Sequence, residues 1–208
     1  MKIIGVTGIS GSGKTLVTRI LANMGGFPVE ADPLAHGLMS KGQEAYNEIV
    51  AAFGEGILGE DGEISRPALG KIVFADKAKL ASLEGIIHPK VAAKTAKLIA
   101  DAEQTGEYRF GIIDAPLLIE AGMHTMCDSC WLITADHETR LLRIIARDGI
   151  SREAAEKRLA SRQGDEALRP YADVVIENNG DNLTILRGRV VEALDVVLGL
   201  SDKSLQVQ

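Results

Sequence analysis

The feature that most constrains the fold is a glycine-rich segment near the amino terminus, Gly8-Ile9-Ser10-Gly11-Ser12-Gly13-Lys14-Thr15. It fits the pattern G-x-x-x-x-G-K-[S/T] and separates an apolar run, Lys2 to Thr7, from a helical pattern, Lys14 to Met24. A strand, a glycine loop and a helix in this order form a phosphate-binding loop. Glycines let backbone N–H groups converge on phosphate oxygens, and the helix N-terminus adds a favourable dipole. A glycine-rich turn without a ligand is the alternative.

The side chains of this loop have expected roles in binding a nucleoside triphosphate. The ammonium of Lys14 should reach the β- and γ-phosphates, and the hydroxyl of Thr15 should hold Mg²⁺. A dinucleotide-binding loop is a weaker interpretation, because Gly11-x-Gly13 lacks the third glycine and gives Lys14 no role. The residues of this segment expected to bind ATP are Gly11, Ser12, Gly13, Lys14, Thr15 and Leu16.

Short apolar runs recur along the chain, and they are apolar throughout instead of alternating with polar residues. This pattern is typical of buried parallel strands. Helical patterns lie between and after these runs, so the sequence predicts an α/β, three-layer fold of the P-loop NTPase class, with helices on both faces of a parallel sheet. The expected strands are Lys2 to Thr7, Phe27 to Ala31, Arg109 to Asp114, Cys130 to Thr134 and Ala172 to Ile176; the expected helices are Lys14 to Met24, Pro89 to Glu103, His137 to Asp148, Arg152 to Arg162 and Leu183 to Leu198.

Two stretches interrupt the alternation of strands and helices. Residues 32–87 hold only helix-like patterns and turn signals, which is more chain than a strand connection needs, so we expect an inserted helical subdomain. A pair of helical patterns around Ser151 is dense in arginine and is expected to form a lid. The predicted division is a nucleotide-binding core of residues 1–31, 88–138 and 168–200, an inserted helical subdomain of residues 32–87 that could bind an acceptor, a lid of residues 139–167 and a polar tail of residues 201–208.

Two aspartates directly follow expected strands. Ligands of an open parallel sheet bind beyond the carboxyl ends of its strands, so Asp32 and Asp114 are the acids able to reach the nucleotide. Asp114 would serve on the metal side. Asp32 opens the inserted subdomain, and its carboxylate would act as a base or orient the acceptor hydroxyl if that subdomain binds the acceptor. The alternatives are a helix cap for Asp32 and a turn residue for Asp114.

Arginines recur at helical spacing in the expected lid. Arg140, Arg143 and Arg147 share one helical face, and Arg158 and Arg162 share a face of the next helix. A solvated face is the usual explanation of such a run. Phosphoryl transfer, however, needs cations over the developing charge, and arginine offers planar donor forks for it. A helix pair that closes over ATP would also exclude water.

Composition and charge exclude several classes of function. The 208 residues are 46% apolar, which is typical of a compact chain with a filled core. A net charge of −6 provides no global positive field for nucleic acid or anionic lipid. No segment has the pattern of a signal peptide or of a bilayer span. We expect a cytoplasmic monomer or small homo-oligomer without nucleic-acid or membrane partners.

The only two cysteines, Cys127 and Cys130, form a single C-x-x-C motif. A zinc site needs about four ligands, and only His124 lies close by in the sequence. A redox motif favours an exposed thiol of low pKa at a helix start, whereas these residues precede the apolar run Trp131-Leu132-Ile133. We interpret the pair as two small residues at the entry of a strand.

An ordered set of motifs resembles the dephospho-coenzyme A kinase family over roughly Lys2 to Leu198. Many families share the phosphate-binding loop, whereas the Pro-Leu-Leu-x-Glu and Ala-Asp-x-Val-Ile-x-Asn-x-Gly segments are specific. The set comprises the loop, Glu30-Ala31-Asp32-Pro33-Leu34-Ala35-His36, Ile87-His88-Pro89-x-Val91, Asp114-Ala115-Pro116-Leu117-Leu118-Ile119-Glu120, the arginines from Arg140 to Arg147, and Ala172-Asp173-Val174-Val175-Ile176-x-Asn178-Asn179-Gly180.

This resemblance implies transfer of the γ-phosphate of ATP, with Mg²⁺, to the ribose 3′-hydroxyl of dephospho-coenzyme A. It assigns catalysis to Asp32, Lys14, Arg143 and Arg147, and it places Asn178 and Gly180 near the adenine of ATP. Implied acceptor contacts are His36, His88, Pro89, Pro116, Leu117, Leu118 and Glu120. The chain departs from the family's usual residues at Glu30, Ile119 and Arg162, which bears on acceptor packing and lid closure.

Two other functions also use a phosphate-binding loop. A kinase with another small acceptor, such as a nucleoside monophosphate, would not be expected to carry Pro116-Leu117-Leu118-Ile119-Glu120. A regulatory GTPase-like switch generally carries Asn-Lys-x-Asp and Asp-x-x-Gly motifs. The chain has neither, since Asp114 is followed by Ala115-Pro116-Leu117.

Overall fold

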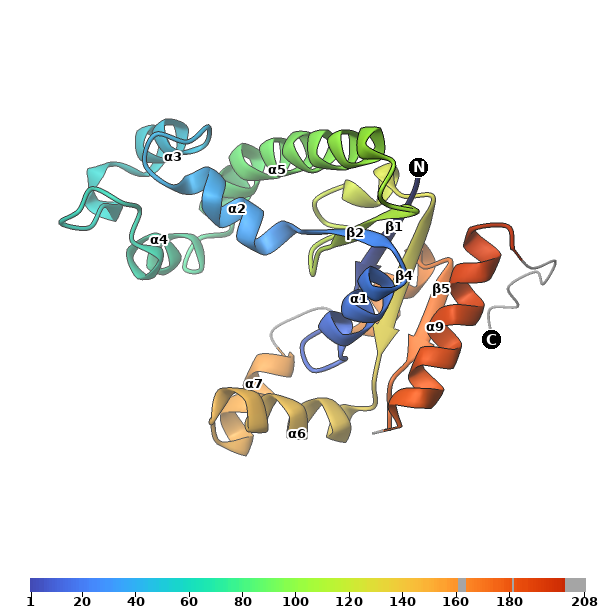
Figure 1. Ribbon diagram of the computed structural model, residues 1–208. Helices are drawn as coiled ribbons and strands as arrows, with labels where there is room; N and C mark the ends of the chain where they lie inside the picture. Colours follow the sequence, from blue (N-terminus) through green and yellow to red (C-terminus); the bar gives the residue numbers. More distant parts are fainter. Residues whose placement is uncertain (161–163, 181, 201–208) are drawn as a thin grey trace. The chain divides into compact units, whose positions relative to one another are not determined.

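A computed structural model describes residues 1–160, 164–180 and 182–200. The chain divides into two compact units, which we call the sheet unit (residues 1–29 and the chain from Asp101 onward) and the helical unit (Glu30–Ala100). The sheet unit is built on a sheet with strand order β2-β3-β1-β4-β5 (Figure 1). The strands are β1 (Lys2–Thr7), β2 (Gly26–Glu30), β3 (Phe110–Asp114), β4 (Ser129–Thr134) and β5 (Val174–Glu177).

The continuous apolar runs correctly predict these strands. Every residue of β3 and β4 is buried, as expected for strands with helices on both faces. The β1–β3, β1–β4 and β4–β5 pairs are parallel. The strand β5 begins two residues later than expected, because the chain before it forms a 3₁₀ turn, η3 (Arg169–Tyr171), and Asp173 accepts a hydrogen bond from the backbone N–H of Cys130.

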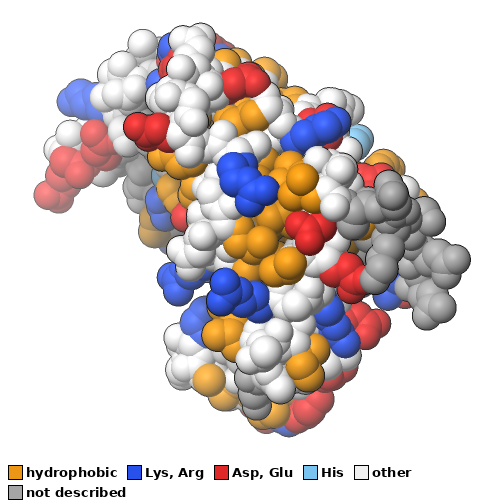
Figure 2. Space-filling model, turned by 45° about the vertical axis from the view of Figure 1, so that its right-hand side comes forward, with side chains coloured by type: hydrophobic (Ala, Val, Ile, Leu, Met, Phe, Trp, Pro, Cys, Tyr) orange, Lys and Arg blue, Asp and Glu red, His pale blue; other side chains and the backbone are white. Residues whose placement is uncertain are grey.

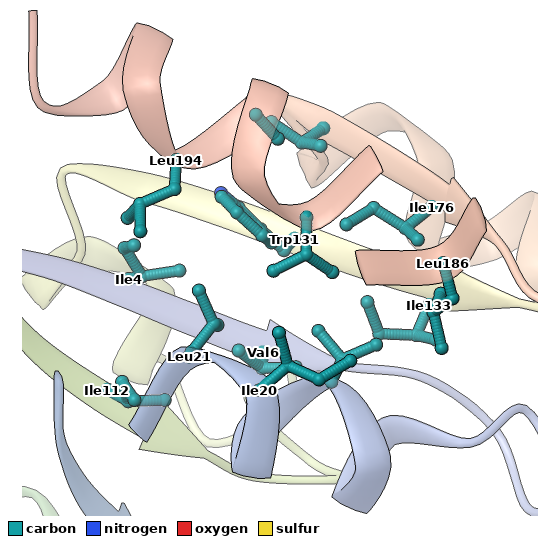
Figure 3. Close-up of a cluster of buried hydrophobic side chains, with 14 of the residues drawn as sticks. Ile4, Val6, Ile20, Leu21, Ile112, Trp131, Ile133, Ile176, Leu186 and Leu194 are labelled. Carbon is teal, nitrogen blue, oxygen red and sulfur yellow. The ribbon is translucent and has the colours of Figure 1, made fainter. Parts of the chain in front are cut away.

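The main hydrophobic core of the sheet unit lies between the sheet and two helices, α1 (Lys14–Asn23) and α9 (Leu183–Val197). Figure 3 shows the indole of Trp131 among side chains from the neighbouring strands and both helices. Buried members of this cluster include Ile4, Val6, Ile20, Leu21, Ile112, Trp131, Ile133, Ile176, Leu186 and Leu194. On the molecular surface, hydrophobic side chains also gather at the centre of the face in Figure 2, with lysine and arginine side chains beside them.

A second, smaller cluster joins the helices of the expected lid. Helix α6 (His137–Asp148) ends at Gly149, whose φ of 63° turns the chain toward α7 (Arg152–Ala160). Leu141 and Ile144 of α6 pack with Ala155 of α7. A short helix, α8 (Asp165–Leu168), follows. Helix α6 has the expected bounds, while Arg162 lies outside the described residues.

The helical unit confirms that the stretch after β2 is helical. Its elements are α2 (Ala31–Met39), α3 (Tyr46–Phe53), η1 (Glu55–Ile57), α4 (Arg66–Val73) and α5 (Lys77–Thr105). The expectation that a helix begins at Pro89 is wrong, because α5 runs through this proline. The predicted subdomain end at residue 87 therefore falls inside a continuous helix.

Helix α5 tolerates Pro89 because the proline faces solvent. Proline supplies no N–H for the carbonyl four residues earlier, which belongs to Gly85, and its ring crowds that carbonyl. Both residues are exposed, so water can bond the carbonyl, while Ile87 and Val91 on either side of the proline are buried. The packing of this buried face stabilises α5 by more than Pro89 destabilises it. No helix in the described part of the chain is long and apolar enough to cross a bilayer.

Replacement of a core side chain tests the packing around Trp131. Ile133→Ala should lower the free energy of unfolding by about 2–5 kcal/mol, because it removes buried methyl groups and leaves a cavity. Ile185→Ala is the matched control, since Ile185 is 55% exposed on α9; it should change that free energy by less than about 0.5 kcal/mol. Urea unfolding measures both, and equal losses would contradict the assigned burial.

Candidate active site

The loop between β1 and α1 has the backbone of a phosphate-binding loop. Gly11 and Gly13 have φ values of 83° and 90°, a region that disfavours residues with a side chain. Neighbours also leave no space, since a Cβ on Gly13 would lie 2.1 Å from Nδ2 of Asn178 and one on Gly11 would lie 2.7 Å from the backbone oxygen of Arg140. Gly13 caps α1, so Lys14 is the first helical residue. The first N–H groups of a helix point away from its own carbonyls, which makes a helix start of this kind suitable for an anion.

Lys14 and Asp114 form an ion pair that the sequence analysis did not predict. Val6 and Asp114 are register partners on neighbouring strands, which brings the carboxylate to the edge where the loop begins. The ammonium of Lys14 forms an ion pair with Oδ1 of Asp114. Oδ2 accepts a hydrogen bond of 2.7 Å from the hydroxyl of Thr18. Asp114 is only 6% exposed, and these two contacts compensate the burial of its charge.

Asn178 joins the end of β5 to the loop. Its Nδ2 donates a hydrogen bond of 2.8 Å to the backbone oxygen of Ser12, and the residue is 4% exposed. Arg143 on α6 extends this contact, because its Nη1 donates to the backbone oxygens of Gly11, at 3.2 Å, and of Asn178, at 2.9 Å. The loop, β5 and α6 are therefore held together by three hydrogen bonds.

A cavity of about 260 Å³ opens beside this junction. It is lined by the apolar side chains of Leu16 and Leu183, both of them exposed, and by the polar groups of Arg143 and Asn178. Apolar walls with a few placed polar groups are typical of small-molecule sites. The lining residues are Gly13, Leu16, Arg143, Asn178, Gly180, Asn182, Leu183 and Leu186.

Arg147 lies one turn beyond Arg143 and contacts two partners. Its Nη2 donates to the hydroxyl of Ser10 in the loop at 3.4 Å, and its guanidinium pairs with Asp148 at 2.8 Å. The hydrogen bond between Arg147 and Asp148 raises the pKa of Arg147 and holds the pKa of Asp148 below its usual range. Arg158 of α7 also pairs with Asp148. The arginine-bearing face of α6 is thus directed partly toward the loop and partly toward its own acids.

The segment after β3 presents only part of its expected acceptor surface. Pro116 is partly exposed, and Leu117 and Glu120 are exposed. Leu118, in contrast, is fully buried, and its side chain lies against Gly5, where a Cβ would be 2.7 Å away. In the described structure Leu118 therefore supports the segment from beneath instead of offering a surface for a ligand.

Four of the expected site residues lie in the helical unit. Asp32 is exposed in the first turn of α2, whose N-cap is Glu30, so Asp32 is not the capping residue. His36 lies one turn later, and partial burial followed by the charge of Arg66 lowers its pKa despite the opposing effect of Asp32. Its imidazole is therefore neutral near pH 7. His88 and Pro89 lie on α5, partly exposed and exposed respectively.

Two polar residues of this region were not anticipated from the sequence. Thr18 lies one turn after Lys14 on α1, and that i, i+4 spacing is the signal that could have identified it. Asp165 accepts a hydrogen bond of 3.2 Å from Arg140, whose backbone packs against Gly11. Burial raises the pKa of Asp165. No local pattern predicts this pair.

Comparison with known proteins supports the interpretation of the loop. The family model described as dephospho-CoA kinase matches residues 2–183, which is most of the chain. The chain belongs to the dephospho-CoA kinase family. It is therefore a kinase, and its five-stranded parallel sheet with flanking helices is the P-loop NTPase fold.

Individual proteins and solved structures are similar to most of the chain. The dephospho-CoA kinase of Geobacter sulfurreducens is 44% identical over 180 residues, covering 86% of this chain and 91% of that protein. Among solved structures, TT1252 from Thermus thermophilus is 31% identical with a TM-score of 0.75, covering 97% of this chain and 98% of its own. Dephospho-CoA kinase from Campylobacter jejuni is 27% identical with a TM-score of 0.68, covering 97% and 100%.

The contact between Asn178 and Ser12 can be tested through nucleotide affinity. Asn178→Ala should weaken ATP binding about tenfold, because it leaves the buried Ser12 carbonyl without a donor and loosens the loop. Asn23→Ala, at an exposed asparagine on α1, is the control and should leave affinity unchanged. Isothermal titration calorimetry measures both, and unaltered affinity in Asn178→Ala would show that the loop does not depend on this amide.

Proposed function

We propose that this kinase transfers the γ-phosphate of ATP to the ribose 3′-hydroxyl of dephospho-coenzyme A, giving coenzyme A and ADP in the last step of coenzyme A synthesis. The observation that carries the proposal is the strand–loop–helix junction with Lys14 as the first helical residue, in a chain of this family. The free amides of that junction suit a triphosphate. ATP and dephospho-coenzyme A would then be its two substrates, and the enzyme would act in the cytoplasm.

The donor side of the reaction rests on residues of the sheet unit. The β- and γ-phosphates would bind the amides of residues 11–16, with Lys14 neutralising their charge. The cavity lined by Leu16, Asn178 and Gly180 is the place for the base and sugar. Lys14 already forms an ion pair with Asp114, which holds its ammonium beside the loop before the nucleotide binds.

Asp32 is the proposed base for the acceptor hydroxyl. It follows the end of β2 by two residues, and the strands of a parallel sheet end at the edge where ligands bind. Its carboxylate is exposed and lies outside the capping position. In that role it would orient the 3′-hydroxyl and take its proton as the bond to phosphorus forms. His36, His88 and Pro89, together with Pro116, Leu117 and Glu120, are the proposed acceptor contacts.

Arg143 and Arg147 are the proposed cations over the transferred group. Both guanidinium groups bond oxygen atoms of the loop, at Gly11 and Ser10. They therefore lie beside the atoms that would surround the phosphates. Planar donor forks at this place would stabilise the charge that develops on the equatorial oxygens. The small hydrophobic cluster between α6 and α7 would let these two helices move together as a lid.

A magnesium ion fits the donor set of this site. The hydroxyl of Thr15 is exposed at the helix start, and Asp114 supplies carboxylate oxygen at the neighbouring strand end. Hard oxygen ligands suit Mg²⁺, which takes few protein ligands and several from phosphates and water. Consistent with this, the described residues contain no group of three or more His, Cys, Asp or Glu side chains placed to hold a metal. When bound, the ion would neutralise charge on the β- and γ-phosphates.

An acceptor panel tests the proposed reaction. Dephospho-coenzyme A should give the highest kcat/KM for ATP consumption, with adenylate and cytidylate at least about a hundredfold lower, because a pocket with polar partners rejects acceptors that leave them unpaired. Mass spectrometry of the product should show phosphorylation at the ribose 3′ position. Faster turnover of either nucleotide would assign a different acceptor to this site.

Replacement of the proposed base separates chemistry from binding. Asp32→Asn should lower kcat at least about a hundredfold while the Kd of ATP changes little, since a base acts mainly in the transition state. Glu44→Gln, at an exposed carboxylate of the same unit, is the matched control and should retain full turnover. If Asp32→Asn keeps its rate, the carboxylate serves only the start of α2.

A further inference from the structure

The two cysteines, which the proposed reaction does not use, lie together at the entry of β4. Cys127 ends η2 (Met123–Met126), and Cys130 is the second residue of β4. Side chains three residues apart on a regular strand would point to opposite faces. The chain bends at Asp128, however, and this bend lets both sulfurs lie on one side. We call Cys127 and Cys130 the thiol pair.

A glycine on the neighbouring strand makes room for the thiol pair. Gly5 of β1 is the register partner of Cys130. A Cβ built on Gly5 would lie 2.7 Å from Sγ of Cys127, so the sulfur occupies the space that a side chain would fill. The Cys127 sulfur therefore lies over Gly5 and next to Cys130. Any larger residue at position 5 would displace it.

The thiols interact directly. The hydrogen bond between them raises the pKa of Cys127, with burial adding to the effect, and lowers the pKa of Cys130. Both sulfurs also lie near the backbone of η2, because Sγ of Cys127 donates to the backbone oxygen of Met123 at 3.5 Å and Sγ of Cys130 donates to that of His124 at 3.8 Å. Cys127 is partly exposed, whereas Cys130 is 7% exposed. The pair therefore combines two neighbouring sulfurs, one of which a small molecule can reach.

We propose that Cys127 and Cys130 form a reversible disulfide, with a low-molecular-weight disulfide as the oxidant. The accessible Cys127 thiol loses its proton to solvent, and its thiolate attacks the small disulfide and releases one small thiolate. Cys130 then loses its proton to solvent and attacks the Cys127 sulfur of the mixed disulfide, releasing the second small thiolate. Two protein thiols are oxidised and one small disulfide is reduced to two thiols, so atoms and electrons balance.

Packing connects the thiol pair to the segment after β3. The side chain of Leu118 shares the space over Gly5 with the Cys127 sulfur. The backbone oxygen of Leu118 also accepts a hydrogen bond of 3.1 Å from His124, in the 3₁₀ turn just before Cys127. Bond formation draws the Cys127 sulfur to about 2.05 Å from that of Cys130, which changes the filling of the space that it shares with Leu118. Because Asp114 and Leu118 belong to one short segment, oxidation should slow phosphoryl transfer; this consequence rests on the proposed function.

Mass spectrometry tests the disulfide independently of any activity. The full chain is incubated with oxidised glutathione, alkylated with iodoacetamide and digested with trypsin. No lysine or arginine lies between Phe110 and Thr139, so one peptide ending at Arg140 carries both cysteines. The expected peptide lacks two hydrogen atoms and carries no alkyl group. A doubly alkylated peptide, or one that carries only glutathione adducts, would overturn the proposal.

A kinetic arm tests the link to turnover. Oxidation should lower kcat at least about fivefold, equivalent to about 1 kcal/mol in the barrier, and dithiothreitol should restore it. Cys127→Ser and Cys130→Ser should match the reduced wild-type rate and not respond to oxidised glutathione, with Cys127→Ala replacing a variant that fails to fold. A disulfide that forms without changing the rate would refute the link to Leu118, while absence of kinase activity in the reduced protein would refute the proposed function instead.

Discussion

The buried carboxylate of Asp114 is the group on which the phosphate-binding region depends. A carboxylate removed from water needs a counter-charge and hydrogen bonds, and Lys14 and Thr18 supply them from the first two turns of α1. Their spacing on the helix and the register of β3 against β1 fix where the lysine ammonium lies. The sheet thereby positions a cation at the mouth of the loop. Asp114 is thus an ion-pair partner within the structure and not only a turn residue before Pro116.

A second set of contacts determines which elements can respond to a bound phosphate. The Ser12 and Gly11 carbonyls accept bonds from Asn178 and Arg143, which belong to the end of β5 and to α6. A change in the loop backbone therefore reaches the end of β5 and helix α6 directly through these two side chains. The absence of a Cβ at Gly13 is what permits Asn178 to approach so closely. The close packing of the Asn178 amide therefore depends on glycine at position 13.

Local sequence patterns predicted the strands and most helix bounds because burial on both faces leaves an unmistakable apolar run, as in β3 and β4. The same reasoning failed at Pro89, since the preference of one residue is weak compared with a buried face that includes Ile87 and Val91. It could not distinguish Leu118 from Leu117 either. Which of two adjacent leucines faces the interior is decided by the space over Gly5, and that space exists only in the folded sheet. The spacing of the arginines along α6 likewise could not predict that Arg143 donates hydrogen bonds to backbone oxygens.

Those arginine contacts also suggest how a ligand could shift helix α6. Arg143 now donates to two neutral carbonyl oxygens, and Arg147 is shared between Ser10 and Asp148. A phosphate oxygen carries negative charge and forms stronger, shorter bonds with a guanidinium than a carbonyl does. A triphosphate in the loop therefore offers both arginines better partners at a small displacement from their present ones. We expect the Gly11 carbonyl and the Ser10 hydroxyl to keep the two guanidinium groups oriented until a nucleotide binds, so that less side-chain entropy is lost on binding.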